Sequence, residues 1–400
     1  MSEPVVTTVS DYAGARDVFR HKQLRQALYD AGEVVMADVL VNLHGDEHRA
    51  RRRLENRLFR RETHARSERQ LFPPIVDRTL APHVAAGRAE LVALSHQLMM
   101  NLAASTAGVD RPQGTPEETG RLYRYMMTFI EGATLAHHTG DRTAKRAEVA
   151  AALEAFDEEF LAPSIARRRD ALARLDAGTL PPEELPQDVL TVLLRNLDDL
   201  QLPPEVVRRE TAFYLLAGAH TSATAFVRTF HEVVELGVAE RGAADPAFLQ
   251  RCVHETIRLH PSSPVAARWA LEDLELADGR RVAAGEQVVI DLIAANRDPA
   301  VFGPDADRFD PARTVPDGVA PWGLSFGLGM HACIGQQLAA GVERDGADPA
   351  EDHLVGLVPV ALGAMLRAGA RRDPADPPTI DPSSSRGYWA TYPVRFDGPR

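Results

Sequence analysis

The stretch from Pro204 to Leu236 constrains the fold most, because it predicts a single helix of roughly nine turns. Small residues gather near its middle, in the run Ala217-Gly218-Ala219-His220-Thr221-Ser222. On spacing alone, such a stripe is typical of a core helix whose small residues allow close packing. One face of this helix would carry Phe213, Ala217, Thr221 and Thr224. A chain built around it must be largely helical.

The rest of the chain predicts a mainly α fold with a minor β region. From about Glu47 to Leu236, apolar residues recur at spacings of three and four, which is typical of amphipathic helices. Strand patterns are few and late, at Arg281–Asp291 and Tyr388–Phe396. The breaks that are rich in proline and glycine show no shift in composition, so residues 1–400 are predicted to form one domain.

Charge and cysteine content exclude several classes of protein. The formal net charge of -12 disfavours nucleic acid and anionic membranes as partners. Two cysteines, Cys252 and Cys333, cannot make a disulfide framework or a structural zinc site. The longest nearly apolar run, Leu354–Leu366, has only 13 residues, and the N-terminus shows no signal-peptide pattern. We therefore expect no membrane segment and a cytoplasmic protein.

The most informative segment surrounds Cys333. Gly327, Gly329 and Gly335 bracket this cysteine, and glycines permit positive φ angles and close approach of the backbone to a bulky group. The residues after it, Ile334–Ala340, are predicted to start a helix whose amides would favour a thiolate. A thiolate held in this way is a good axial ligand for iron. The alternative, from spacing alone, is a structural cysteine in a glycine-rich loop.

The pattern Phe326-Gly327-x-Gly329-x-His331-x-Cys333-x-Gly335 resembles the haem-binding loop of the cytochrome P450 family, with all six defining positions filled. The resemblance implies a cytochrome P450-like fold and haem b (iron protoporphyrin IX) as the cofactor. It also implies that Cys333 is the proximal thiolate ligand, that Phe326 packs near it and that His331 reaches a haem propionate.

A second motif lies upstream, where Glu255 and Arg258 are three residues apart on a predicted helix that Pro261 ends. On its own, this spacing indicates an ordinary surface ion pair. In the resembled family, a Glu-x-x-Arg pair is buried and bonded to an arginine of a later meander, which implies Arg308 in this chain. The trio would be structural and would support the face that holds the thiolate.

The resemblance places the middle of the long helix across the distal face of the haem. Ala217 and Gly218 would make room for dioxygen, and Thr221 would donate a hydrogen bond to it and take part in proton delivery. The family usually has an acidic residue before this threonine, whereas this chain has His220. An imidazole can carry protons near neutral pH, so His220 is either a substituted relay or a histidine of the core.

A basic helix supplies the expected propionate ligands. His48 and Arg52 match the His-x-x-x-Arg helix of the family, and Arg268 matches a third propionate ligand. Arginine suits this role because its fork binds carboxylates bidentately, although a solvated basic helix is the alternative. The neighbouring arginines form an expected positive patch for an acidic electron donor such as a ferredoxin: Arg49, Arg51, Arg53, Arg57, Arg60 and Arg61.

The chain departs from the family pattern in two places. The His-x-x-x-Arg helix comes early, which predicts a short N-terminal region without the first helix and part of the first sheet. The segment Gly341–His353 interrupts what is ordinarily one continuous helix. By position, the substrate pocket is expected to include Phe213, Val265, Ala266 and Ser385.

These features predict a haem-thiolate monooxygenase that inserts one oxygen atom of O₂ into a small organic substrate, in natural-product metabolism. The chain has no flavin or nicotinamide fingerprint, so electrons are expected from NAD(P)H through a ferredoxin reductase and a ferredoxin. Two alternatives stay open. One is a haem-thiolate enzyme of other chemistry, such as oxidative coupling, nitrogen oxidation or peroxide-driven turnover. The other is a haem sensor or carrier without catalysis.

Overall fold

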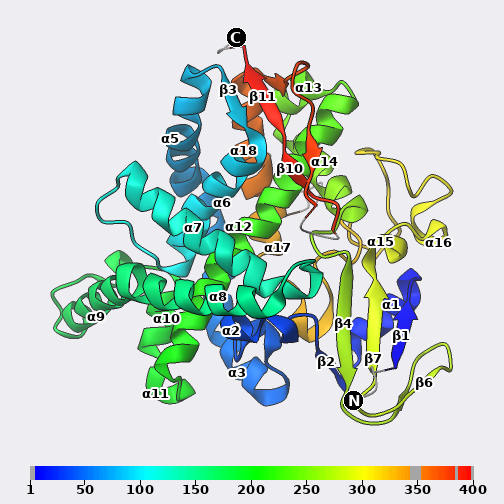
Figure 1. Ribbon diagram of the computed structural model, residues 1–400, viewed down its shortest axis with the longest axis horizontal. Helices are drawn as coiled ribbons and strands as arrows, with labels where there is room; N and C mark the ends of the chain where they lie inside the picture. Colours follow the sequence, from blue (N-terminus) through cyan, green and yellow to red (C-terminus); the bar gives the residue numbers. More distant parts are fainter. Residues whose placement is uncertain (1–4, 343–352, 383–385, 398–400) are drawn as a thin grey trace.

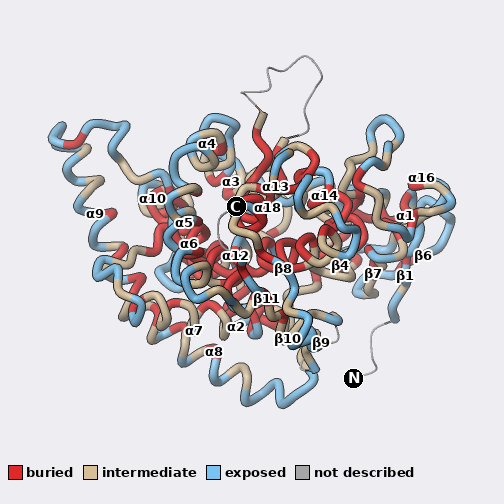
Figure 2. The backbone as a smooth tube through the Cα atoms, turned by 90° about the horizontal axis from the view of Figure 1, so that it is seen from above, coloured by how far each residue is buried: buried red, intermediate tan, exposed pale blue. Residues whose placement is uncertain are grey.

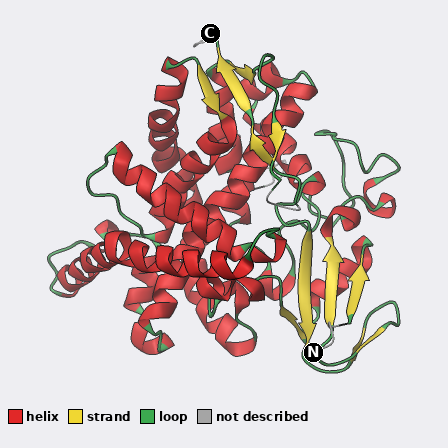
Figure 3. Ribbon diagram, in the orientation of Figure 1, coloured by secondary structure: helices red, strands yellow, loops and turns green. Residues whose placement is uncertain are grey.

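The computed structural model describes residues 5–342, 353–382 and 386–397. Helices dominate it, and the strands form separate groups, one beside the N-terminus and one near the C-terminus (Figure 3). The longer helices are α1 (Tyr12–Arg20), α3 (Gly45–Glu55), α5 (Phe72–Ala85), α6 (Leu91–Ala107), α7 (Pro116–Ala133), α8 (Arg142–Phe156), α9 (Ala162–Asp176), α12 (Pro204–Glu235), α14 (Pro246–Leu259) and α18 (Leu357–Arg367). The shorter ones are α2 (Glu33–Met36), α4 (Arg61–Arg66), α10 (Val189–Arg195), α11 (Leu197–Leu200), α13 (Ala239–Ala244), α15 (Leu292–Ala295), α16 (Pro299–Phe302) and α17 (Gln336–Ala340). The predicted mainly α fold with a minor β region is confirmed.

Helix α12 runs through the centre of the molecule (Figure 1) and covers the long helix that the sequence predicted. It begins with Pro204 at its first position, where the fixed φ of proline favours a helix start. It packs most extensively against α6, and also against α14 and α7. Figure 2 shows buried backbone gathered along α12, whereas α9 projects outwards with exposed residues. The small residues of α12 therefore lie in the interior.

The largest sheet has the strand order β1-β7-β4-β2. Strand β1 (Val6–Val9) runs parallel to β7 (Gln287–Asp291), and β4 (Val265–Ala270) is antiparallel to both β7 and β2 (Leu24–Gln26). The remaining strands form smaller sheets, with the orders β3-β11-β8, β10-β9 and β5-β6. They are β3 (Arg88–Glu90), β5 (Leu274–Glu275), β6 (Arg281–Val282), β8 (Ala370–Arg372), β9 (Thr379–Ile380), β10 (Trp389–Thr391) and β11 (Pro393–Phe396).

The N-terminal region corrects one sequence expectation. The absence of a first helix was predicted, but α1 is present, and Asp11 caps it by accepting a hydrogen bond from the Gly14 N–H at 2.7 Å. Strands β1, β2 and β3 also lie in the first hundred residues, where no strand was expected. They escaped notice because strands of three or four residues carry too little alternation to be recognised.

The buried apolar residues form two cores. One surrounds α12 and its neighbouring helices, and the other lies between the largest sheet and α1. The segment before Cys333 runs between them, because Leu324 belongs to the second core and Leu328 packs against it, whereas Phe326 packs against the first. The loop that carries the cysteine thus lies on the boundary between the two cores.

The expected helix interruption lies between α17 and α18. The two ends of the interruption lie side by side, since the Val342 N–H donates to the Leu354 carbonyl at 2.9 Å. Gln250 Nε2 donates to the Ala340 carbonyl at 3.0 Å, and the Glu68 carboxylate accepts from the Gly356 N–H at 2.8 Å. Residues 343–352 of the interruption lie outside the described residues. Among the described residues, no helix is long and apolar enough to cross a membrane.

A buried ionic cluster joins α3 to α12. The Arg51 guanidinium is 2% exposed, contacts Glu210 of α12 and donates to the Asp38 carbonyl at 2.9 Å. The hydroxyl of Tyr214 donates to the carboxylate of Glu55. The prediction that Arg51 belongs to a surface patch is therefore wrong, because its guanidinium is buried. The partners named above compensate the buried charge. Burial raises the pKa of Glu210 to about 8 and that of Glu55 to about 7.

This cluster predicts that the protein loses stability as the pH rises between about 5 and 8. A carboxyl whose folded-state pKa lies above its ordinary value of 4.5 keeps a proton in the folded chain that the unfolded chain releases. The free energy of unfolding then falls with pH until the folded pKa is passed. We expect the Glu210→Gln variant, whose amide stays neutral, to lose less stability than the wild type over this range in urea unfolding.

The matched control for this prediction is Asp46→Asn, which changes a carboxylate that is 93% exposed. Its stability should follow the wild-type pH dependence. If the free energy of unfolding had the same pH dependence in the wild type and in Glu210→Gln, the Glu210 carboxyl would not change its protonation on unfolding.

Candidate functional site

The cysteine loop holds the Cys333 thiol against backbone donors. The Cys333 N–H donates to the Phe326 carbonyl at 2.8 Å, which closes the loop, and the N–H groups of Gly335 and Gln336 point at the sulfur. Burial raises the pKa of this thiol, while these N–H groups and the Arg52 charge act in the opposite direction. The thiol thus lies deep within the fold, yet the Cys333 side chain is not packed against protein atoms and borders an open space. The thiol can therefore meet a bound group.

Glycine is required where the loop meets α1. Gly329 has a φ of 69°, and a Cβ atom there would lie 2.7 Å from the Phe19 carbonyl oxygen. The Phe326 ring packs edge-on against Trp322, with 5.4 Å between ring centroids. Gly327 also has a positive φ, whereas a Cβ at Gly335 would meet no atom within 4 Å. The part of the loop that precedes the cysteine is thus fixed against α1 and Trp322.

The four predicted propionate ligands lie together near this loop. The rings of His48 and His331 are in contact, with 4.6 Å between centroids, and none of their buried ring nitrogens has a hydrogen-bond partner. Arg52 Nη2 donates to the Ala332 carbonyl at 2.7 Å, which ties α3 to the cysteine loop. Arg268 is 4% exposed and contacts Gln26 across the sheet. The positive charges of Arg268 and Arg52 both lower the pKa of His331.

Burial lowers the pKa of His48 to about 4 and that of His331 to about 3, with further lowering by the neighbouring cations. Burial also lowers the pKa of Arg268 to about 10. The cluster thus combines buried positive charge with unpaired ring nitrogens, and carboxylates would satisfy both.

The middle of α12 has an uncovered stripe. Gly218 and Thr221 are exposed and Ala217 is half-buried, although Ala219 and Ser222 beside them are buried. The Thr221 hydroxyl donates to the Ala217 carbonyl at 2.8 Å. A long central helix with exposed residues at its midpoint borders a space rather than another packed element.

These residues fit a haem. The uncovered thiol of Cys333 with its N–H donors can bind iron, and the buried basic cluster can bind two propionates. The small residues of α12 leave room beside a flat ring. Cys333, His48, Arg52, Arg268 and His331 would hold the group.

The Glu255–Arg258 pair is buried and forms a network. Arg258 Nη2 lies 2.7 Å from Glu255 Oε1, and Arg258 Nη1 donates to the carbonyls of Asn296 and Ala306 at 2.6 and 2.7 Å. The Asn296 side chain accepts from the Leu324 N–H at 2.7 Å, which connects the network to the start of the cysteine loop.

The third member of this network is Arg313, whose Nε lies 3.0 Å from Glu255 Oε1. The prediction of Arg308 is wrong. Arg308 is exposed, and its backbone carbonyl accepts a hydrogen bond from Arg313 Nη2 at 3.0 Å. Both arginines lie in the same polar stretch, and the sequence spacing contains no signal that distinguishes them. The fold decides, because only the Arg313 side chain turns back towards α14.

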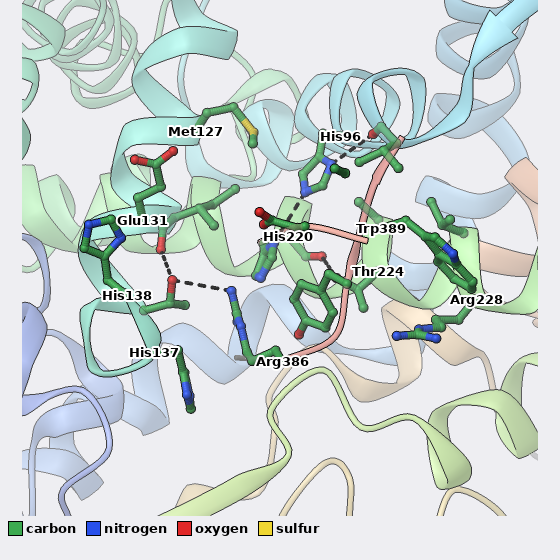
Figure 4. A pocket seen from close by; sticks show the side chains of 18 of the residues that line it. His96, Met127, Glu131, His137, His138, His220, Thr224, Arg228, Arg386 and Trp389 are labelled. Atoms are coloured by element: carbon green, nitrogen blue, oxygen red, sulfur yellow. Dashed lines mark hydrogen bonds between the residues drawn. The ribbon is translucent and has the colours of Figure 1, made fainter. Parts of the chain in front are cut away.

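A cavity of about 510 Å³ lies along α12, between α6, α7 and the C-terminal segment (Figure 4). Three of the predicted pocket residues do not line it. Phe213 is half-buried against Tyr214, β4 places Ala266 in the second core, and Val265 is half-buried. Ser385 lies outside the described residues. The cavity follows later turns of α12 and is lined by His220, Ala223, Thr224, Val227 and Arg228, with Arg386 and Tyr388 opposite.

His220 lines this cavity and also contacts another histidine. Its Nδ1 lies 3.4 Å from Nε2 of His96 in α6, and the two rings are stacked with 5.7 Å between centroids. Burial lowers the pKa of His220 well below its ordinary value, so the ring is neutral near pH 7. His96, Arg313 and Tyr388 are residues of the site region that the sequence did not indicate.

The family model and the curated relatives that match this chain all point to cytochrome P450. The family model of cytochrome P450 matches residues 244–341, which contain the Glu255–Arg258 pair and the cysteine loop. The chain is 42% identical over 104 residues to the cytochrome P450 family protein EryCII of Saccharopolyspora erythraea, covering 26% of this chain and 28% of that protein. It is 35% identical over 162 residues to the putative cytochrome P450 140 of Mycobacterium bovis, covering 40% and 35%. The chain thus spans less than half the length of these curated relatives.

Solved structures match over nearly the whole chain. The crystal structure of P450BioI in complex with hexadec-9Z-enoic acid ligated acyl carrier protein has a TM-score of 0.74 at 19% identity, covering 98% of this chain and 92% of that one. A mutant of P450 EryK in complex with erythromycin B has a TM-score of 0.70 at 22% identity, covering 98% and 91%. At these identities the likeness shows the fold. The fold, the cysteine loop and the family model agree: the chain resembles the cytochrome P450 family in sequence over residues 244–341 and in fold over nearly its whole length.

Proposed function

We propose that this protein is a single-domain haem-thiolate monooxygenase that inserts one oxygen atom of O₂ into a small organic substrate. The observation that carries the proposal is the uncovered Cys333 thiol with its two backbone donors. The cluster of His48, Arg52, Arg268 and His331 supports it, with His48 and Arg268 buried and Arg52 and His331 half-buried. When bound, haem b supplies a thiolate-ligated iron at which dioxygen is activated.

The residues of α12 shape the space beside that group. Ala217 and Gly218 are small and uncovered, so they leave room for a diatomic molecule. The Thr221 hydroxyl donates a hydrogen bond to the Ala217 carbonyl, so its oxygen lone pairs stay available to accept a hydrogen bond. Ser262 Oγ donates to the Thr221 carbonyl at 3.2 Å and holds this turn in place. Thr221 is thus able to hold a water molecule or a proton at its Oγ1.

The test of the proposal is the absorption spectrum of the purified protein, reduced with dithionite under carbon monoxide. A strongly red-shifted Soret band is expected from a thiolate-ligated haem. A protein that binds no haem, or that gives the shorter-wavelength band of a nitrogen-ligated iron, would overturn the proposal. The haem sensor or carrier alternative keeps the band and is recognised by the lack of product with any substrate that binds.

Replacing Thr221 by alanine is expected to uncouple oxygen consumption from product formation, because the hydroxyl that holds the proton is lost. The ratio of product to oxygen consumed should fall by about tenfold or more, because a positioned proton-transfer group typically contributes about 10²–10⁴-fold to the rate. The control is Thr211→Ala, which loses the same kind of bond, Oγ1 to the Val207 carbonyl at 2.9 Å, on the core side of the helix. Equal coupling in both variants would remove Thr221 from the mechanism.

Electrons are proposed to come from NAD(P)H through a ferredoxin reductase and a ferredoxin in the cytoplasm. Exposed arginines around α3 and α4 support this choice, because they gather positive charge on a chain whose net charge is -12. They are Arg49, Arg53, Arg57, Arg60 and Arg61. A role in natural-product metabolism is supported by the likeness to EryK, whose structure holds erythromycin B.

Peroxide-driven turnover is the second candidate, and a specific observation favours it. The position before Thr221 holds a neutral histidine instead of the usual acid, so delivery of protons to dioxygen lacks its ordinary source. Hydrogen peroxide already carries the protons and electrons that dioxygen requires. Product formation with hydrogen peroxide but not with a ferredoxin system would establish this candidate, and the reverse result would exclude it.

A further inference from the structure

The cavity beside α12 has mostly apolar walls. Val92, Met127, Ile130, Ala223 and Val227 line it, and its volume of about 510 Å³ is in the range of ligand pockets. Its lining includes residues of α6, α7 and α12 and of the segment near β10, as Figure 4 shows.

Many of the polar groups in this lining already have partners within the protein. The Thr224 hydroxyl donates to the His220 carbonyl at 3.0 Å, and the Thr134 hydroxyl donates to the Ile130 carbonyl at 2.7 Å. Arg228 Nη2 donates to the Gly387 carbonyl, and Lys145 is paired with Glu131. A ligand therefore gains few new hydrogen bonds from these groups.

His220 is different. Among the described residues that line the cavity, it alone has a fully buried side-chain polar atom, Nε2, without a hydrogen-bond partner. The residue is 92% buried, since its exposed fraction is 8%. A buried polar atom without a partner has lost the hydrogen bond that water would give it, so a partner for it is expected. In Figure 4 the ring lies between His96 and Arg386, within the cavity lining.

The contacts of the histidine pair determine which nitrogen of His220 carries the proton. His96 Nδ1 lies 3.0 Å from the Val92 carbonyl, which can only accept, so His96 Nδ1 must be protonated. Burial lowers the pKa of His96, so its ring is neutral and its Nε2 presents a lone pair. This lone pair faces His220 Nδ1 at 3.4 Å, and only a protonated Nδ1 makes that contact favourable. His220 Nε2 is then an unprotonated acceptor.

The surrounding charge limits the group that this acceptor can take. Arg386 acts on both His96 and His220 and lowers the pKa of each, so positive charge lies close to the pair. The Arg386 guanidinium also lies 4.4 Å from the centroid of the Tyr388 ring, on the cavity wall. An ammonium group would be repelled there, whereas a neutral hydroxyl would not.

We propose that the cavity binds a mostly apolar ligand that carries a neutral hydroxyl group, and that His220 Nε2 accepts the hydrogen bond from this hydroxyl. The identification of this ligand as the substrate rests on the proposed function. This bond fixes the position of the ligand hydroxyl along α12, at the turn that also carries Thr221. His220 is therefore a specificity-determining residue, and His96 is the positioning residue that fixes its tautomer.

The first test measures the tautomer directly. The protein is labelled with ¹⁵N-histidine and studied by NMR in the diamagnetic ferrous carbon monoxide form, and the His220 signals are assigned by their loss in His220→Phe. We expect Nδ1 to be protonated and Nε2 to be unprotonated at pH 7. A protonated Nε2 would overturn the proposal. The tautomer is read from the wild-type signals, and the variant serves only to assign them.

The second test compares 4-ethylphenol with 4-ethylanisole, which keeps the oxygen and loses the donated proton. Calorimetry should give the phenol an affinity about fivefold higher, equivalent to ~1 kcal/mol for a neutral hydrogen bond. His220→Phe should reduce this ratio to about one. The control is His138→Phe, which changes another histidine of the cavity lining and should keep the wild-type ratio.

Equal affinities in the wild type, or an unchanged ratio in His220→Phe, would overturn the inference. Its failure is separate from failure of the proposed function. A red-shifted carbon monoxide band with equal affinities leaves the haem-thiolate function intact and removes the hydroxyl site. A ratio that depends on His220 in a protein without the thiolate band retains the site and removes the monooxygenase proposal.

Discussion

Replacing Cys333 by serine is expected to abolish the red-shifted Soret band of the reduced carbon monoxide complex. A serine hydroxyl cannot replace a thiolate as the electron-donating axial ligand, so oxygen activation is lost with the band. The N–H donors of Gly335 and Gln336 stay in place, because they belong to the backbone of the loop and of α17. The variant should therefore fold, and its spectrum should report on the ligand alone.

The matched control is Cys252→Ser. Cys252 is fully buried in α14, and burial raises the pKa of its thiol to about 12, so it stays a neutral thiol. Cys252→Ser should keep the band and lose some stability, because a hydroxyl replaces a sulfur in an apolar core. If the Cys333→Ser protein kept a red-shifted band, the thiolate ligand would have to come from elsewhere.

The second large effect is expected from Arg313→Ala, which should lower the free energy of unfolding by ~3–5 kcal/mol. The Arg313 guanidinium is 7% exposed and binds the Glu255 carboxylate, the Asp305 carboxylate at 2.9 Å and the Phe302 carbonyl at 2.6 Å. Truncation leaves Glu255 buried with only one of its two arginines. Urea unfolding measures the loss, and the haem content of the purified protein should fall with it.

Arg308→Ala is the control for this network, since Arg308 lies five residues earlier and is exposed. Its free energy of unfolding should stay within ~0.5 kcal/mol of the wild type. A larger loss for Arg308→Ala than for Arg313→Ala would mean that the meander adopts another arrangement in solution.

Local sequence patterns predicted the elements whose residues follow a period or a fixed spacing. The α12 helix is of this kind, whereas the roles of the cysteine loop and of the Glu255–Arg258 pair were expected from the resemblance of these short motifs to those of a known family. Strands β1 and β2 were not predicted, since their stability comes from pairing with residues more than two hundred positions away. Long-range pairing leaves little trace in three or four residues.

The same distinction explains the errors in the site. The choice between Arg308 and Arg313 depends on how the meander folds back on α14, which no local pattern encodes. The contact between His96 and His220 joins helices 124 residues apart in the sequence. The pocket residue Ala266 was chosen by position, but the pairing of β4 with β7 directs its side chain into the second core.

The position of the cysteine loop between the two cores has a consequence for the cooperativity of folding. Side chains at alternate positions of the loop join first one core and then the other, so neither core can form its full boundary without the loop. A group that binds only the folded loop adds its binding free energy to the folded state. Haem bound to this loop would therefore stabilise the helical part and the sheet part of the chain together, and we expect the two parts to unfold in one transition when it is bound.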